Sequence, residues 1–260
     1  MPARLLQLIV IVLIMAALTG CSQFVSDNRH NVPLPKALID RMAAIGSSSS
    51  EPMMIRVYKQ TSELEVWKRT NNGRYALLKT YPICKWSGEL GPKIQEGDHQ
   101  SPEGFYDVTP ALMNPKSNYL LSFNVGFPNK FDRAWGRNGT YLMIHGDCKS
   151  VGCYAMTDEG IKEIYALARE TFKGGNRSFQ LQLLPFRMTD ANLIANSNSA
   201  HAPFWRNLKE GTDIFDSAGV PPLVDVCEKH YVFNRNGAGQ PPLDPSGACP
   251  VASFSTISAL

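Results

Sequence analysis

One short segment, residues 144–156, restricts this chain more than any other part of its sequence. The apolar run that enters it is typical of a buried strand and ends at His145. Seven residues, mostly small or polar, separate His145 from Cys153. Beyond the cysteine, Thr157 can cap a helix whose first turn is acidic and whose apolar residues recur at helical spacing. The fold therefore has to place a cysteine between the end of a strand and the start of a helix.

A histidine and a cysteine in this arrangement suit covalent catalysis. The positive end of the following helix would lower the pKa of the Cys153 thiol, and His145 would accept its proton as general base. Gly152 would let a substrate carbonyl approach the backbone, and the N–H groups of Gly152 and Cys153 would form an oxyanion hole. Ser150 and Gly146 are expected to shape the turn rather than to react.

The residues alone leave other interpretations open. Cys153 could be a buried structural thiol or half of a disulfide, with His145 a core residue. Cys148 could be the nucleophile, or could pair with Cys153. We favour Cys153 as the nucleophile because a disulfide across this short turn would be strained and because Cys148 lacks the following helix start.

The chain has six cysteines, and their number bears on this choice. If Cys21 carries a lipid, five remain in an exported chain, so one thiol is expected to stay unpaired and reactive. Pairing of Cys227 with Cys249 and of Cys84 with Cys148 would satisfy the count. No CxxC pair with partner ligands indicates a metal site, and no cofactor is expected.

The N-terminal stretch predicts export. Residues 5–18 form an uncharged apolar run after a basic residue, which suits a secretory signal and is short for a membrane span. The run ends in Leu18-Thr19-Gly20-Cys21, which resembles a bacterial lipobox, so we expect a signal peptide over residues 1–20 and a lipid anchor at Cys21. An ordinary cleavable signal with a chance cysteine is the alternative. By resemblance to sorted lipoproteins, Ser22 implies a periplasmic location at the outer membrane.

The remaining sequence predicts a mainly β fold with helices, of the α+β class. A net charge of +3 is too small to indicate nucleic-acid binding. We expect a tether, a catalytic domain, a C-terminal extension and a mobile tail, over residues 21–52, 53–186, 187–233 and 234–260. Predicted strands cover residues 53–58, 64–68, 74–84, 104–108, 119–125, 140–145, 178–184 and 223–233. Predicted helices lie at 35–45, after Thr157, from Thr189 and over 201–208.

A second motif accompanies the first. Ser101-Pro102-Glu103-Gly104-Phe105-Tyr106 resembles the Thr/Ser-Pro-x-Gly-x-Tyr/Phe entry to a strand in the L,D-transpeptidase (YkuD-type) family, whose catalytic motif joins a His-Gly strand to a Ser-x-Gly-Cys turn. The resemblance implies an L,D-transpeptidase-type β-sandwich with a helix after the cysteine and a C-terminal helical extension. It also implies Cys153 as nucleophile and His145 as general base, acting on peptidoglycan stem peptides.

Departures from the common family pattern resemble one branch of it. The insert between the histidine and cysteine motifs is short, Val151 replaces a histidine, and the arginine that would bind a substrate carboxylate after the cysteine is missing. This form resembles the YafK-like proteins, a branch with peptidoglycan diaminopimelate–protein amidase-like activity. The resemblance implies hydrolysis of the bond between peptidoglycan diaminopimelate and an attached outer-membrane lipoprotein.

The acyl acceptor and the residues that bind substrate are less constrained. Basic candidates to replace the missing arginine are Arg133, Arg137, Lys149 and Arg187, whereas Tyr106 and Trp135 are expected to line the cleft or simply to pack. A transpeptidase that forms crosslinks or attaches proteins is the first alternative to hydrolysis. A non-catalytic peptidoglycan-binding lipoprotein is the second, and a redox or metal protein that uses Cys148 and Cys153 is the third.

Overall fold

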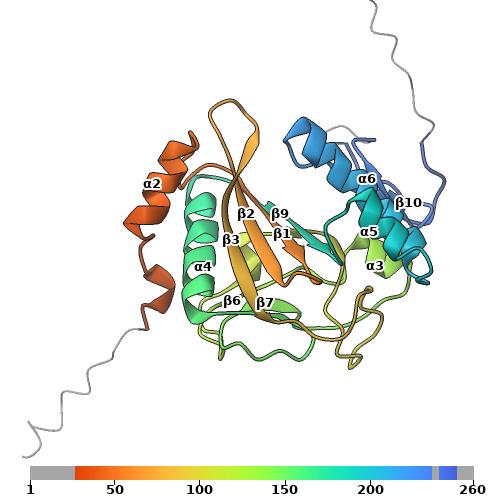
Figure 1. Ribbon diagram of the computed structural model, residues 1–260, viewed down its shortest axis with the longest axis horizontal. Helices are drawn as coiled ribbons and strands as arrows, with labels where there is room; N and C mark the ends of the chain where they lie inside the picture. The colour runs from red at the N-terminus through yellow and green to blue at the C-terminus, as the bar shows by residue number, and fades with distance from the viewer. Residues whose placement is uncertain (1–26, 236–239, 251–260) are drawn as a thin grey trace, which may run out of the picture.

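The computed structural model describes residues 27–235 and 240–250, so the predicted signal peptide and Cys21 lie outside the described residues. The described chain forms a nine-stranded sheet flanked by helices (Figure 1). The strands follow the order β4-β9-β1-β2-β3-β8-β7-β6-β5 across the sheet. Their bounds are β1 Met53–Tyr58, β2 Glu63–Arg69, β3 Tyr75–Lys85, β4 Gly104–Val108, β5 Met113–Asn114, β6 Ser122–Asn124, β7 Met143–His145, β8 Tyr154–Met156 and β9 Phe179–Leu184.

The long strand β3 joins the two halves of the sheet. Its first part pairs with β2 and its last residues pair with β8. The halves pack on each other, because the ring of Phe123 on β6 lies 5.9 Å from the ring of Phe179 on β9. The predicted α+β class is therefore confirmed, and both layers belong to one curled sheet that shares β3.

Burial explains the most regular elements. β1 lies between β2 and β9, and all six of its residues are buried, as expected for a strand covered on both faces. Helix α4, Asp158–Lys173, begins where the Thr157 hydroxyl accepts a hydrogen bond from the Gly160 N–H, and it turns its apolar stripe toward the core. The helix predicted to follow the cysteine is thus present.

The N-terminal helices lie outside α4 (Figure 1). The short helix η1, Arg29–Asn31, precedes α2, Lys36–Ala44, whose position matches the predicted helix over residues 35–45. Leu38 and Met42 of α2 are buried in the main core. This part of the predicted tether therefore packs on the domain. Two short helices lie further along the chain: η2 Pro110–Leu112 and α3 Lys130–Ala134.

The C-terminal extension contains the predicted helices and one difference from prediction. Helices α5, Asp190–Ala195, and α6, Ala202–Ala218, are followed by two strands instead of the one expected over residues 223–233. The strands β10, Val224–Cys227, and β11, His230–Phe233, form a hairpin. Glu228 and Lys229 both have left-handed φ angles, 48° and 57°, which make the two-residue turn between them.

Two disulfides are present, Cys84–Cys148 and Cys227–Cys249, and Cys153 is the free cysteine of the described chain. These are the two pairs that the sequence offered as one way to satisfy the cysteine count. The sequence also predicts a mobile tail from residue 234. Over residues 240–250 the structure instead holds the tail against the hairpin, through the second disulfide and backbone hydrogen bonds from Glu228 to Gly247 and from Lys229 to Pro245. None of the helices in the described ranges is long and apolar enough to cross a membrane.

Candidate active site

Strand register brings His145 and Cys153 to one cavity. β7 and β8 are parallel neighbours, with Ile144 opposite Tyr154 and His145 opposite Ala155. Side chains alternate along a strand, so Cys153, two residues before Ala155, faces the same side as His145. Both residues line a cavity of about 330 Å³, together with Lys85, Tyr119, Tyr141, Cys148, Lys149, Ser150 and Val151.

The cysteine does not lie at a helix terminus. Strand β8 and the capping residue Thr157 separate Cys153 from α4, which begins at Asp158. A helix dipole acts mainly within the first turn, so the prediction that it lowers the thiol pKa is wrong. Burial instead raises the pKa of Cys153 above its ordinary value, and a hydrogen bond from the Met143 backbone and the ammonium of Lys93 only partly oppose that rise. The resting sulfur is a thiol, and its S–H group donates to the Tyr141 carbonyl at 3.5 Å.

The imidazole of His145 is oriented by its own turn. Its Nδ1 lies 2.6 Å from the carbonyl oxygen of Gly146. A carbonyl only accepts, so Nδ1 carries the proton and Nε2 keeps a free lone pair. The ring of Tyr119 packs against the imidazole with centroids 4.7 Å apart. Burial lowers the pKa of His145 below its ordinary value, although the Gly146 carbonyl and Asp147 oppose this. The group is thus a neutral base at neutral pH.

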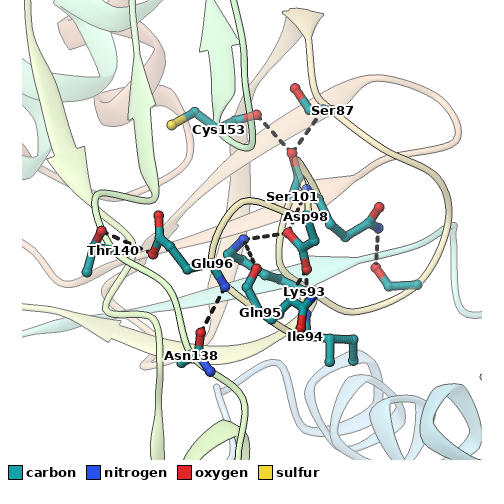
Figure 2. Close-up of polar contacts among 12 residues, drawn as sticks. Ser87, Lys93, Ile94, Gln95, Glu96, Asp98, Ser101, Asn138, Thr140 and Cys153 are labelled. Atoms are coloured by element: carbon teal, nitrogen blue, oxygen red, sulfur yellow. Dashed lines mark hydrogen bonds and ion pairs between the residues drawn. The ribbon is translucent and has the colours of Figure 1, made fainter.

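Two serines bind the backbone of Cys153, and a third serine binds both of them. The Ser101 hydroxyl donates to the Cys153 carbonyl at 2.9 Å, and the Ser150 hydroxyl donates to the same oxygen at 2.7 Å. Ser87 binds both of these serines, through its backbone N–H to Ser101 and its hydroxyl to Ser150. Figure 2 shows Ser101 between Ser87 and Cys153. The Ser-Pro-x-Gly motif therefore has a physical role here, because its serine fixes the position of the cysteine.

The predicted oxyanion hole is only half available. The Cys153 N–H donates to the Ser150 hydroxyl at 3.1 Å, so it is occupied in this conformation. The Gly152 N–H has no hydrogen-bond partner among the described residues. Gly152 has φ +98°, a backbone conformation that a side chain would strain. One free donor therefore lies directly before Cys153, on a residue whose φ favours glycine.

A loop close to Cys153 is organised by Asp98 (Figure 2). Its carboxylate accepts hydrogen bonds from the Lys93 ammonium and from the backbone of residues 94, 95 and 100. Glu96 joins this loop to the segment before β7, accepting from the Thr140 hydroxyl at 3.2 Å while its N–H donates to Asn138 (Figure 2). The loops over residues 85–102 and 126–139 thus contact each other, and Lys93 brings a buried positive charge close to the thiol.

The predicted substrate-binding residues lie elsewhere. Tyr106 is buried and donates to Asp132 at 3.0 Å. Arg133 donates to the Pro128 carbonyl, and Arg187 binds Glu63 and Glu65 on β2. None of the three predicted residues lines the cavity around Cys153.

Of the other predicted candidates, only Lys149 lines the cavity. Arg137 is held by Asp132 at 3.1 Å, and the Trp135 indole donates to the Lys229 carbonyl near the C-terminal hairpin. Lys149 does line the cavity, and Lys85 joins it. Lys85, Ser87 and Lys93 were not predicted as site residues, because they lie in or beside a loop without periodicity and act only through tertiary contacts. No group of three or more potential metal ligands occurs in the part of the chain that the structure describes.

Comparison with known proteins identifies the class. The model of the L,D-transpeptidase catalytic domain (YkuD) matches residues 52–176. Two relatives named Putative L,D-transpeptidase YafK, from Escherichia coli strain K12 and E. coli O157:H7, are 45% identical over 184 residues, 71% of this chain and 74% of theirs. The solved structure of the helical cell shape determining protein Pgp2 from Campylobacter jejuni is 18% identical, with a TM-score of 0.42 over 70% of this chain and 66% of that one.

The chain belongs to the L,D-transpeptidase family, and it is a cysteine-dependent enzyme of that family. Its predicted likeness to the YafK-like branch is confirmed by the identity to both relatives. Peptidoglycan is the substrate consistent with this family.

Proposed function

We propose that this enzyme uses Cys153 as nucleophile and His145 as general base to hydrolyse the bond between peptidoglycan diaminopimelate and an attached outer-membrane lipoprotein. The observation that carries the proposal is the shared cavity, in which a free thiol faces the same side as a neutral imidazole with an open Nε2. A binding protein has no need of that pair. The site thus supports acyl transfer over mere recognition of the cell wall.

The first half of the reaction forms a thioester. After rotation away from the Tyr141 carbonyl, the Cys153 S–H gives its proton to Nε2 of His145 while sulfur attacks the amide carbonyl of diaminopimelate. The Gly152 N–H can donate to the developing oxyanion. The C–N bond then breaks, and the leaving amine takes the proton from His145. Retention of Nδ1–H by the Gly146 carbonyl keeps the imidazole correctly oriented throughout.

The second half decides the product. If water attacks the thioester, His145 removes one proton from it and returns a proton to sulfur, and a diaminopimelate carboxylate is released. If an amine attacks, the product is a new amide. Transpeptidation, either crosslinking or protein attachment, is therefore the second candidate, and the name carried by the two YafK relatives favours it. Both outcomes require the same cysteine and histidine.

We also propose that the enzyme acts in the periplasm, anchored to the outer membrane by a lipid on Cys21. The support is the sequence alone, in the apolar run over residues 5–18 and the lipobox-like residues before Cys21. Metabolic labelling with a fatty-acid analogue tests the anchor. Wild type should take up the label and Cys21→Ala should not, and labelling of both would refute a lipid on that residue.

Mass spectrometry of a lipoprotein–muropeptide conjugate tests the reaction. Wild type should release the muropeptide and the lipoprotein with addition of one water, and Cys153→Ala and His145→Gln should not. Amine-exchanged or crosslinked products from wild type would replace hydrolysis by transpeptidation. Equal behaviour of wild type and Cys153→Ala would overturn the cysteine mechanism and leave a binding role.

A further inference from the structure

Two lysines line the Cys153 cavity. Lys85 is the last residue of β3, and Lys149 lies in the turn before Cys153, yet both line the cavity. Each lysine directly follows one half of the Cys84–Cys148 disulfide, whose Cα atoms are 5.1 Å apart. The disulfide thus holds at one cavity two lysines whose positions in the sequence are 64 residues apart.

The charges of these lysines are largely unsatisfied. Lys85 is exposed and forms no ion pair among the described residues. Lys149 lies 3.5 Å from Asp147, with side chains 80% and 47% exposed, and an exposed pair of this kind contributes little. No carboxylate side chain is among the residues that line the cavity. The rim of the site therefore presents excess positive charge to an arriving substrate.

The proposed substrate carries a matching group. Diaminopimelate has two carboxyl carbons, and when one is the acyl carbon attacked by Cys153, the other remains a free carboxylate. None of the predicted arginines lines the cavity to receive it. We propose that Lys85 and Lys149 bind this second carboxylate and that the Cys84–Cys148 disulfide holds the two lysines in place to do so. The inference rests on the proposed function and specifies the substrate group that the site selects.

If the two lysines bind the second carboxylate, the enzyme should select substrates in which that carboxylate is charged. A conjugate whose second carboxylate is amidated keeps the scissile bond and the shape but loses the charge. It should bind less tightly to wild type, and the lysines should contribute nothing to its binding. Because both ammonium groups are exposed, the preference should also weaken as salt increases from about 0.05 to 0.5 M.

Steady-state kinetics on the free and amidated conjugates test the proposal. On the free conjugate, Lys85→Gln and Lys149→Gln should each raise KM about 3- to 5-fold and the double variant about 10-fold, with kcat within about 2-fold of wild type. On the amidated conjugate the same variants should match wild type. Lys36→Gln is the matched control, because Lys36 is an exposed lysine on α2 whose side chain is 86% accessible. Unchanged KM in the double variant, or equal loss on both conjugates, would overturn the lysine pair.

A binding measurement separates this inference from the proposed function. Cys153→Ala cannot turn over, so calorimetry with free and amidated muropeptides measures recognition alone. Tighter binding of the free form, lost in Cys153→Ala carrying both lysine substitutions, would support the pair even if no hydrolysis occurs. Equal binding of both forms would reject it. The variant Cys84→Ser/Cys148→Ser, checked for native circular dichroism, should lose the preference for the free over the amidated muropeptide. A retained preference would show that the disulfide does not hold the lysines in place.

Discussion

The two disulfides of this chain fasten regions of different kinds. Cys84–Cys148 joins the end of β3 to the turn before Cys153, and Cys227–Cys249 joins the C-terminal hairpin to the tail. Both have Cα separations of 5.1 Å. The difference lies in what else holds each region in place.

The catalytic turn has little apolar packing of its own. Asp147, Cys148 and Gly152 all have left-handed φ angles, and Val151 is 74% exposed. Its other restraints are hydrogen bonds, chiefly those of Ser150.

The hairpin is packed far more firmly. The ring of Tyr231 stacks on Phe131 at 4.3 Å, and the Asn207 side chain binds both backbone groups of Tyr231. A crosslink is therefore expected to set the geometry of the turn, whereas in the hairpin it only adds stability.

Removal of each disulfide is the strongest test of this comparison. By loop-closure entropy, the loss of the 64-residue and 22-residue crosslinks should each cost about 3 to 4 kcal/mol of unfolding free energy. Their activities should diverge. Cys84→Ser/Cys148→Ser should lose roughly 100-fold in kcat/KM because the nucleophile shifts, and Cys227→Ser/Cys249→Ser should stay within about 3-fold. Urea unfolding and conjugate hydrolysis measure the two effects. Equal losses of activity would show that the comparison is mistaken.

Glu103 links the Ser-Pro-x-Gly motif to the C-terminal extension through Trp205 of α6. Glu103 of that motif is fully buried, pairs with buried Lys59 at 3.0 Å, and accepts from the Trp205 indole at 2.9 Å. Glu103→Gln leaves the Lys59 ammonium without its counter-charge, so unfolding free energy should fall by about 3 kcal/mol. The double variant Lys59→Met/Glu103→Gln should recover part of this loss in urea unfolding. A double variant that loses the sum of both single effects would show that the pair is not coupled.

The sequence was sufficient where a pattern is local and long. The mostly apolar run over residues 53–58 and the helical repeat after Thr157 predicted β1 and α4, and the strand predicted to end at His145 does end there. The cysteine count predicted two disulfides and one free thiol but not which cysteines pair, and the structure supplies that connectivity.

The sequence was insufficient where a few residues act through partners that are distant along the chain. β8 has three residues, too few for any periodicity, so the helix was placed directly after Cys153. The Cys153 N–H was predicted to be free, but the Ser150 hydroxyl accepts it. Ser87 and Ser150 are 63 positions apart in the sequence, so their contact forms only in the folded chain. The roles of Cys153 and His145 remain predictions, because only activity measurements test them.

Substitution of Ser101 should weaken the turn before Cys153 without breaking a covalent bond. The Ser101 hydroxyl is fully buried, accepts from the Ser87 N–H and donates to the Cys153 carbonyl. Ser101→Ala leaves these groups short of a partner, which should cost about 1 to 2 kcal/mol of stability and roughly 10-fold in kcat. Ser101→Thr keeps the hydroxyl and should restore most of kcat. Failure of Thr to rescue, with the fold intact, would show that the hydrogen bonds of Ser101 do not position the nucleophile.

The smallest expected effect tests the electrostatics of the turn itself. Burial raises the pKa of the Cys153 thiol and lowers that of His145, so at pH 7 the pair is a thiol beside a neutral imidazole. A neutral ring cannot stabilise a thiolate, and His145→Gln should change the rate of iodoacetamide alkylation by less than about 3-fold while it abolishes turnover. In both proteins, alkylation should rise with pH through about 8.5 and beyond, because the thiolate forms only there.

In wild type, the acid-side decline of kcat/KM should have its midpoint below about pH 6.5. The lowered pKa keeps His145 unprotonated, and therefore able to act as a base, in weak acid. An alkylation rate that is flat between about pH 5 and 8 in wild type, and that loses this plateau in His145→Gln, would mean a thiolate–imidazolium pair at rest. Cys153 would then be a thiolate before substrate binds, and its attack would need no proton transfer to His145.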